Sequence, residues 1–201
     1  MFRPWAGPDS PRMFENDLLD AVSRTHWAFV PLTVIPANAW VFWQGAQRGE
    51  TLGPILGWAL AGVLVWTLTE YWLHRTLFHW IPEGDWGRRM HFLIHGVHHD
   101  WPHDKYRLVL PPGASVPLYV LFLLLWTFAF GSAGWAFHGG FATGYMIYDL
   151  THYYLHHGRP KARLLRRLQG HHASHHFNKK FAEKRFGVSS PLWDWVFRTY
   201  A

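Results

Sequence analysis

Histidine stands out in this sequence, because 16 of the 201 residues are histidines and none is a cysteine. The lack of cysteine rules out disulfides, thiolate metal sites, iron–sulfur clusters and a Cys nucleophile. A bound metal must therefore take nitrogen and oxygen ligands, and imidazole suits iron, zinc, copper and nickel. A two-metal centre that binds dioxygen needs redox-active ions, so zinc could occupy such a site without making it work.

Thirteen of the histidines fall into four groups along the chain, and ten of these have the spacing of ligands. Residues three and four positions apart share a helical face, so each HxxHH motif is expected to present its histidines together. His74 and His79 are five apart, so they straddle a face and are expected to flank a metal pair. About five imidazoles would serve each of two metals. The ten candidate ligands are His74, His79, His95, His98, His99, His152, His156, His172, His175 and His176.

Four apolar stretches of nearly 20 residues must position these groups, at 27–45, 52–73, 114–132 and 135–155. A helix of about 20 residues crosses the hydrocarbon core of a bilayer. The short links at 46–51 and 131–134 indicate two helical hairpins. The sequence thus predicts an all-α integral membrane protein with four spans in one domain, 1–201, after a polar segment at 1–26. The alternative is a soluble helical protein with buried core helices.

Charge is distributed on one side of these spans. With four spans, 18 of the 19 Lys and Arg residues lie on the side of the histidine groups, and only Arg48 lies on the other. This asymmetry places the histidines on the cytoplasmic face, in a helical cap. The 14 Arg against 5 Lys favour a bacterial plasma membrane over the endoplasmic reticulum.

Two acidic residues lie close to candidate ligands. Glu70 precedes His74 by one helical turn, where its carboxylate could orient an imidazole through the second ring nitrogen or reach toward lipid headgroups. Asp149 lies deeper in its span, where an ionisable group usually has a function. We expect Asp149 and its neighbour Tyr148 to support a ligand or contact a substrate. The alternative for Asp149 is a structural hydrogen bond with a neighbouring tyrosine.

Three further histidines and one arginine adjoin the candidate ligands. His91 lies one turn before His95 and is expected in the core or behind a ligand, with a ligand role as the alternative. His157 and His171 are each next to a candidate ligand in sequence, so they point elsewhere on a helix. Arg107 is a candidate contact for an acyl headgroup, or else a solvated or lipid-facing side chain.

A basic run follows the fourth stretch and has two interpretations. It would bind anionic lipid headgroups, or it would dock an acidic electron donor. Nucleic acid is not an expected partner of a chain with four spans. The run consists of Arg159, Lys161, Arg163, Arg166 and Arg167.

Taken as strings, these motifs resemble the fatty acid hydroxylase and sterol desaturase superfamily, and within it most closely the fatty acid 2-hydroxylases. The resemblance covers about residues 60–200. The matching segments are 70–79 (EYWLHRTLFH), 91–99 (HFLIHGVHH), 104–112 (DKYRLVLPP), 144–156 (GYMIYDLTHYYLH), 172–177 (HASHHF) and 187–194 (GVSSPLWD).

The resemblance implies a helical membrane domain, a cytosolic cap and a di-iron centre held by the same ten histidines. The implied reaction is hydroxylation of an acyl chain beside its carbonyl, with dioxygen as co-substrate and electrons from a separate b-type cytochrome or ferredoxin with its reductase. Eukaryotic members often carry an N-terminal b-type cytochrome domain, whereas only about 26 polar residues precede the first apolar stretch here.

Two other functions stay open at this point. The same centre could desaturate a lipid, or hydroxylate a sterol, carotenoid or alkane. A non-enzymatic membrane metal-binding or transport protein is the third interpretation. A transporter should place its ionisable ligands within the spans, whereas these cluster on one side.

Overall fold

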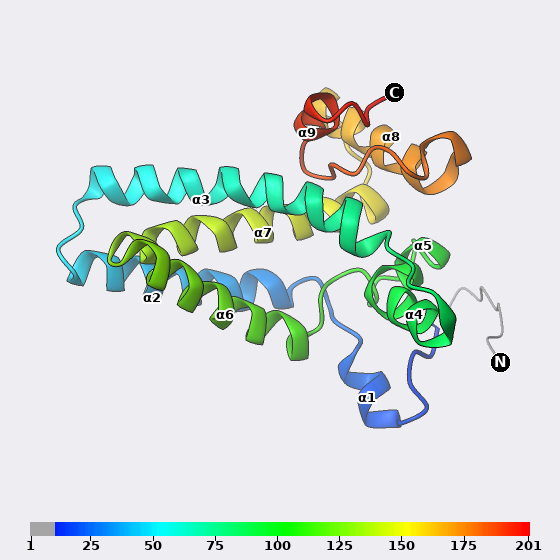
Figure 1. Ribbon diagram of the computed structural model, residues 1–201, viewed down its shortest axis with the longest axis horizontal. Helices are drawn as coiled ribbons and strands as arrows, with labels where there is room; N and C mark the ends of the chain where they lie inside the picture. Colours follow the sequence, from blue (N-terminus) through cyan, green and yellow to red (C-terminus); the bar gives the residue numbers. More distant parts are fainter. Residues whose placement is uncertain (1–10) are drawn as a thin grey trace.

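The computed structural model describes residues 11–201, and helices are the only regular secondary structure in that range (Figure 1). The predicted all-α class is therefore confirmed. Residues 1–10, the start of the expected polar N-terminal segment, lie outside the described residues.

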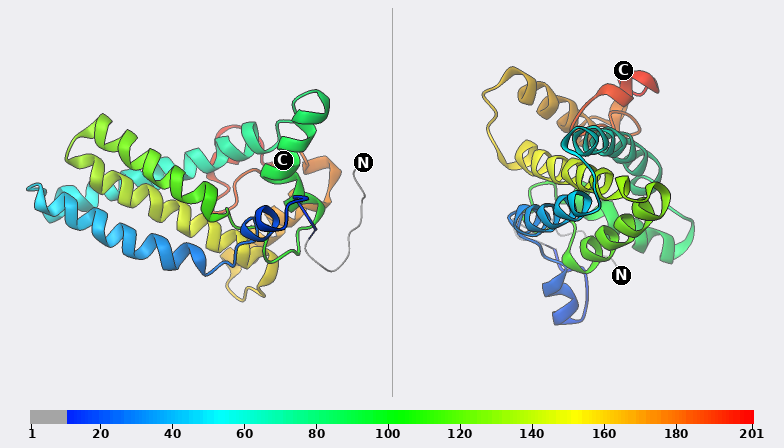
Figure 2. Two further views of the ribbon diagram at one scale, coloured as in Figure 1. Left: turned by 90° about the horizontal axis from the view of Figure 1, so that it is seen from below. Right: turned by 90° about the vertical axis from the view of Figure 1, so that its left-hand side faces the viewer.

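Four long helices form an elongated bundle (Figures 1 and 2). Each begins and ends within two residues of an apolar stretch expected from the sequence. The α2–α3 and α6–α7 turns lie together at the end of the bundle far from both termini, as two helical hairpins require. The four helices are α2 (Phe29–Gln47), α3 (Leu52–Trp72), α6 (Pro112–Phe130) and α7 (Ala133–His157).

Two of these helices are long and apolar enough to cross a bilayer, namely α6 and the continuous helical segment Leu52–Phe78 that contains α3. No residue of α6 is buried, and Phe128 is 91% exposed. A helix that is apolar and exposed along its length is stable against lipid tails rather than water. The structure therefore supports a membrane protein with two candidate spans. Helices α2 and α7 have the length of a span, but α7 carries several polar residues and is mostly packed against its neighbours.

Close packing of α3 on α7 depends on two glycines that face each other across the helix pair. A Cβ on Gly62 would lie 2.1 Å from the carbonyl oxygen of Phe137, and one on Gly140 would lie 1.9 Å from that of Ala59. Small residues let membrane helices approach in this way. The close crossing matters because α3 continues into the segment that carries His74, and the end of α7 carries His152 and His156.

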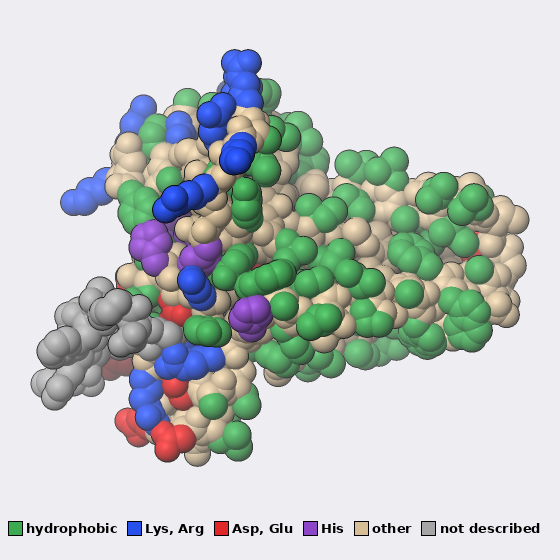
Figure 3. Space-filling model, turned by 180° about the vertical axis from the view of Figure 1, so that it is seen from behind, with side chains coloured by type: hydrophobic (Ala, Val, Ile, Leu, Met, Phe, Trp, Pro, Cys, Tyr) green, Lys and Arg blue, Asp and Glu red, His purple; other side chains and the backbone are tan. Residues whose placement is uncertain are grey.

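The opposite end of the bundle carries shorter helical segments and most of the charge. On the face shown in Figure 3, hydrophobic side chains cover the bundle, and Lys and Arg gather over this end. We call this end the cap. Its elements are α1 (Asp17–Val22), η1 (Leu73–Phe78), α4 (Gly84–His91), η2 (Phe92–Gly96), α5 (Val97–Asp100), α8 (Arg163–Phe177), η3 (Lys179–Phe181) and α9 (Leu192–Val196).

Candidate metal centre

The cap brings all ten candidate ligands together, as two groups of five imidazoles. Within each group, one ring nitrogen from every histidine lies within 4.8 Å of the others. The groups adjoin, since the rings of His99 and His176 stack with centroids 4.2 Å apart. Group 1 is His74, His79, His95, His99 and His175; group 2 is His98, His152, His156, His172 and His176.

The two HxxHH motifs are each divided between the groups, contrary to the expectation that each would present its histidines together. His95 and His99 enter group 1, whereas His98 enters group 2. His172 and His176 enter group 2, whereas His175 enters group 1. The reason is helical geometry: with 3.6 residues per turn, positions i+3 and i+4 lie on opposite sides of position i. Each motif therefore supplies both groups.

His74 and His79 both enter group 1, so the expectation that they flank a metal pair is wrong. The segment between them, η1, is a π-helix. A π-helix bonds residue i to i+5, which brings residues five apart onto one side. A second π-helical segment, η2, contains His95. The local widening of the helix is what gathers these histidines.

The spacing of the ring nitrogens fits metal ligation. In group 2, Nε2 of His172 lies 2.9 Å from that of His152 and 2.8 Å from that of His156. In group 1, Nε2 of His95 lies 3.2 Å from that of His74 and 3.0 Å from that of His99. Imidazole nitrogens bind a metal at about 2.1 Å, so two neighbouring ligands at a right angle are about 3 Å apart.

The electrostatic environment keeps these imidazoles neutral. Burial, together with the nearby histidines, lowers the pKa of His79 and of His99 to about 3. Burial and the same crowding hold the pKa of His95, His98 and His172 well below the usual value. A neutral imidazole has a free lone pair, which is the form that binds a metal.

Two ligand candidates of group 1 are oriented by backbone carbonyls. Nδ1–H of His74 donates to the carbonyl of Phe186 at 2.6 Å, and Nδ1–H of His175 donates to that of Lys184 at 2.7 Å. Donation from Nδ1 fixes the tautomer and directs the Nε2 lone pair of each ring into the group. The segment 184–189 therefore lies directly behind group 1.

Glu70 anchors this segment. The sequence suggested that its carboxylate orients an imidazole directly, but its hydrogen bonds go to the segment instead. Its Oε1 accepts hydrogen bonds from the backbone amides of Val188 at 2.7 Å and Ser189 at 2.8 Å. Its Oε2 accepts from the Ser189 hydroxyl. Glu70 is only 4% exposed, so it does not extend to lipid headgroups either. It acts on His74 through the backbone next to Phe186.

Asp194 is a second anchor, which the sequence reasoning missed. Its fully buried carboxylate accepts hydrogen bonds from the amides of Phe186 and Gly187, both at 2.9 Å, and from the Thr199 hydroxyl at 2.7 Å. It also lies 3.0 Å from Nε2 of His171. The available signal was the acidic residue that ends the GVSSPLWD string, between Trp193 and Trp195.

The three histidines that adjoin candidate ligands in the sequence groups lie outside both five-imidazole groups. His171 bonds Asp194 and stacks on Tyr200, so it points away from its neighbour His172 as expected. His157 packs against Tyr153. His91 packs beside Gly96.

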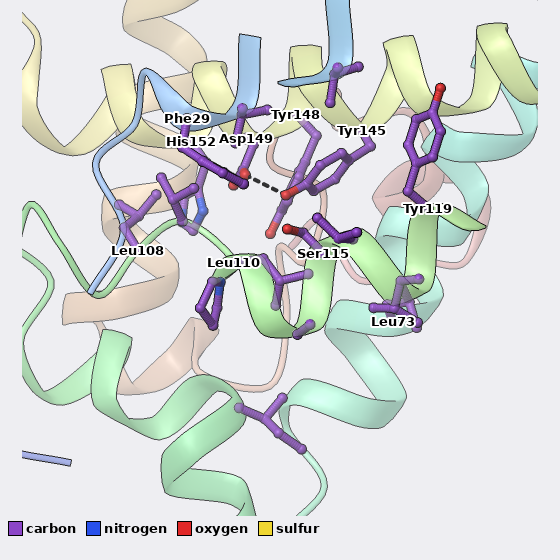
Figure 4. A pocket seen from close by; sticks show the side chains of 18 of the residues that line it. Phe29, Leu73, Leu108, Leu110, Ser115, Tyr119, Tyr145, Tyr148, Asp149 and His152 are labelled. Carbon is purple, nitrogen blue, oxygen red and sulfur yellow. Dashed lines mark hydrogen bonds between the residues drawn. The ribbon is translucent and has the colours of Figure 1, made fainter. Parts of the chain in front are cut away.

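A large apolar cavity runs from the histidines into the bundle (Figure 4). Its volume is about 640 Å³, and His95, His98 and His152 line one end. The sticks in Figure 4 show Tyr145 pointing toward Asp149, and its hydroxyl donates to that carboxylate at 2.9 Å. Asp149 thus makes the tyrosine hydrogen bond considered as the alternative, and both it and Tyr148 also line the cavity.

Arg107 lies at the cap end of this cavity, and it is neither solvated nor lipid-facing. Its side chain is 1% exposed and forms an ion pair with Asp20 at 2.9 Å. It also donates to the Pro11 carbonyl at 2.9 Å and to the Ser23 hydroxyl. Its Nε has no hydrogen-bond partner among the described residues. Arg107 thus ties the N-terminal segment to the cap beside the cavity.

Comparison with known proteins finds relatives along nearly the whole chain. The family model for fatty acid hydroxylases matches residues 59–199. A dihydroceramide fatty acyl 2-hydroxylase of Arabidopsis thaliana is 43% identical over 95% of this chain and 80% of its own length. The fatty acid 2-hydroxylase of Homo sapiens is 35% identical over 94% of this chain and 56% of its own length.

A solved structure has the same fold. That structure is full-length scs7p, in which only the hydroxylase domain is visible. It superposes with a TM-score of 0.82 and is 39% identical in sequence, and the match covers 94% of this chain and 71% of that one. The resemblance found in the motifs is therefore confirmed over nearly the whole chain. From its sequence and its fold alike, the chain belongs to the fatty acid hydroxylase family.

Proposed function

We propose that this protein is a membrane-bound di-iron enzyme that hydroxylates the second carbon of a lipid acyl chain. The ten histidines would be the ligands, with group 1 and group 2 holding one metal each. The observation that carries the proposal is the position of two five-imidazole groups at one end of an apolar cavity of about 640 Å³.

Iron bound by these imidazoles would supply dioxygen activation, whereas zinc, which fits the same nitrogen ligands, has no redox chemistry. The chain itself holds and orients the ligands. The carbonyls behind His74 and His175 fix two imidazoles of group 1, and the anchors Glu70 and Asp194 hold the segment that supplies them. The apolar cavity wall excludes water from the carbon that reacts.

The shape of the cavity supports an acyl substrate. Its wall is mostly apolar, and the cap contributes His95, His98 and Arg107 to it. An acyl chain would lie along the apolar part with its carbonyl toward the cap. The unpartnered Nε–H of Arg107 and the cavity-facing Tyr148 and Asp149 are the candidate contacts for the head of the substrate. The second carbon would then lie beside the histidines.

We further propose that all four long helices cross the membrane and that the cap lies in the cytoplasm. Support comes from the near-equal lengths of the helices and from the one-sided distribution of Lys and Arg. A bacterial plasma membrane fits the Arg-rich composition. Residues 1–201 would form one domain, since the cap and the bundle share the cavity.

Electrons would come from a separate protein, a b-type cytochrome or a ferredoxin with its reductase. The exposed side chains of Arg163, Arg166 and Arg167 at the start of α8 support docking of an acidic donor on the cap. The same residues would also contact anionic membrane lipids.

The test is lipid mass spectrometry on cells that express the chain, beside His98→Ala and His175→Ala variants that each remove one candidate ligand of a different group. We expect one added oxygen at the second acyl carbon, absent with either variant. A product with two hydrogens fewer, or with oxygen on a sterol, carotenoid or alkane, would instead assign one of the alternative oxidations. Unchanged products in both variants would contradict an enzymatic role of the histidines.

A further inference from the structure

The end of α8 brings an exposed aromatic ring into contact with the histidine groups. Phe177 is 65% exposed, and the centroid of its ring lies 5.8 Å from that of its neighbour His176. His176 belongs to group 2 and stacks on His99 of group 1. Both of these histidines are only partly buried. At Phe177 the surface of the cap therefore reaches the junction between the two groups.

Cationic side chains follow this ring along the chain. Lys179 and Lys180 are exposed in the short helix η3. The whole segment 177–185 contains four cationic side chains and one carboxylate. We call Phe177, Lys179 and Lys180 the Phe177 surface. An exposed aromatic ring with a charged rim is typical of a site for a protein partner, and the sign of the charge favours an acidic one.

The two ends of α8 lie at different levels of the cap. The start of the helix lies beside the bundle, whereas its end lies toward the tip of the cap (Figures 1 and 2). Arg163 and Phe177 are the first and last residues of α8, so a rise of 1.5 Å per residue places them about 21 Å apart along its axis. A membrane around the bundle would reach the start of α8 before its end. The Phe177 surface is thus open to a soluble partner.

The proposed function needs a protein partner at such a place. Hydroxylation of one C–H bond by dioxygen consumes two electrons and two protons and releases one water molecule. A one-electron carrier must therefore deliver twice for each product molecule, and its redox group must come close to the histidine groups each time. The Phe177 surface meets this condition, because it adjoins both groups and faces away from the bundle.

We propose that the Phe177 surface docks an acidic one-electron carrier protein. The ring of Phe177 lies at the centre of the contact, and Lys179 and Lys180 pair with carboxylates of the carrier. Each docking event oxidises the carrier by one electron and reduces the proposed iron centre by one. The inference rests on the proposed hydroxylase function and specifies where its electron donor binds. Exposed Arg163 and Arg166 at the start of α8 also attract acidic proteins, so they form the competing docking site.

The experiment measures docking without turnover. The purified protein is loaded with zinc, which fits the nitrogen ligands and has no redox chemistry. It is titrated at low ionic strength with the soluble haem domain of an acidic b-type cytochrome and, separately, with an acidic ferredoxin. The charge variant is Lys179→Glu with Lys180→Glu. Arg163→Glu with Arg166→Glu is its matched control, because it makes the same change of charge at the other end of α8.

We expect at least one of the two carriers to bind the wild type, and the lysine variant to bind it about tenfold more weakly, because like charges then oppose the encounter. High salt should reduce this difference. The arginine control should bind the carrier as the wild type does. Equal zinc contents would show that the histidine groups are intact in all three proteins. Equal weakening in both variants, a larger effect in the arginine control, or no binding of either carrier to the wild type would overturn the inference.

Truncation of the ring tests its place in the contact separately from the charges. Phe177→Ala should weaken binding about 5- to 30-fold, the usual effect of removing an aromatic anchor from the centre of an interface. Trp195→Ala is the control, since it truncates another aromatic side chain of the cap, 62% exposed on α9. It should leave binding unchanged. Wild-type affinity in Phe177→Ala would overturn the proposed contact.

A second measurement follows electron delivery to the iron-loaded protein. The reduced carrier is mixed with the protein in the absence of oxygen, and the absorbance of the carrier gives the rate of its oxidation. Lys179→Glu with Lys180→Glu should slow this rate about tenfold at equal iron content, and an unchanged rate would overturn the inference. Docking that follows the expected pattern without any 2-hydroxylated lipid would count against the proposed function alone, because the titration needs no product.

Discussion

Oε1 of Glu70 accepts a hydrogen bond from the backbone amide of Ser189 at 2.8 Å, although 119 positions separate the two residues. The contact ties α3 to the segment that supplies the Phe186 carbonyl to His74. A carboxylate in the bundle thus helps to hold the segment that orients a candidate ligand in the cap.

Replacement of Glu70 by Ala should lower metal affinity or hydroxylated product about 10- to 100-fold, the usual effect of losing support behind a ligand. The amides of Val188 and Ser189 would lose their acceptor, and the segment behind His74 would shift. Glu70→Gln should restore much of the loss, because its amide oxygen can still accept both backbone bonds. The exposed Glu83→Ala is the control. Metal content and product are measured, and full activity of Glu70→Ala would contradict the role.

Metal content should separate the two histidine groups. His175→Ala removes one ligand candidate of group 1, and His98→Ala removes one of group 2, so each should weaken binding of one metal while the other remains. Elemental analysis of purified protein should find two metals per chain in the wild type and nearer one in each variant. His103→Ala, in an exposed loop, should keep two. Loss of both metals in every ligand variant would instead indicate a single cooperative site.

The α3–α7 crossing should not tolerate a side chain at Gly140. Gly140→Ala places a Cβ 1.9 Å from the Ala59 carbonyl oxygen, so the helices must separate, which typically costs about 1–3 kcal/mol. Gly57→Ala lies on α3 with no atom within 4 Å of the new Cβ, so it is the matched control. Melting temperatures in detergent should fall for Gly140→Ala only. An equal fall for both would contradict the packing explanation, because Ala has the higher helix propensity and should not destabilise the open position at Gly57.

The metal-free protein should lose stability as the pH falls below about 6.5. Burial and neighbouring histidines lower the pKa of His79 and His99 to about 3, so between 6.5 and about 3 the unfolded chain binds more protons than the folded one. Stability therefore rises with pH in this window and is lost on acidification. Melting temperatures after chelation should be lower at pH 5.5 than at pH 7.5. The double variant His79→Gln, His99→Gln should show a shallower dependence, and an unchanged slope would contradict these pKa shifts.

The sequence by itself determined the helices, the ten candidate ligands and the family. Apolar stretches of nearly 20 residues are a one-dimensional signal, because the length of a helix follows from its rise per residue. The histidine motifs are local strings as well, so they could be recognised without coordinates. The structure then places every one of the ten in a five-imidazole group.

Only the tertiary structure decided which histidines belong to group 1 and which to group 2, and which residues orient them. Helical geometry puts positions i+3 and i+4 on opposite sides of position i, but only the packing of the other helices decides which group lies on each side of His98 and His175. The π-helical widening between His74 and His79 depends on the same packing. The contacts of Glu70, Asp194 and Arg107 each join two segments that are separated along the sequence and meet only in the folded cap. Sequence spacing carries no information on such contacts, since they form only when separate helices meet.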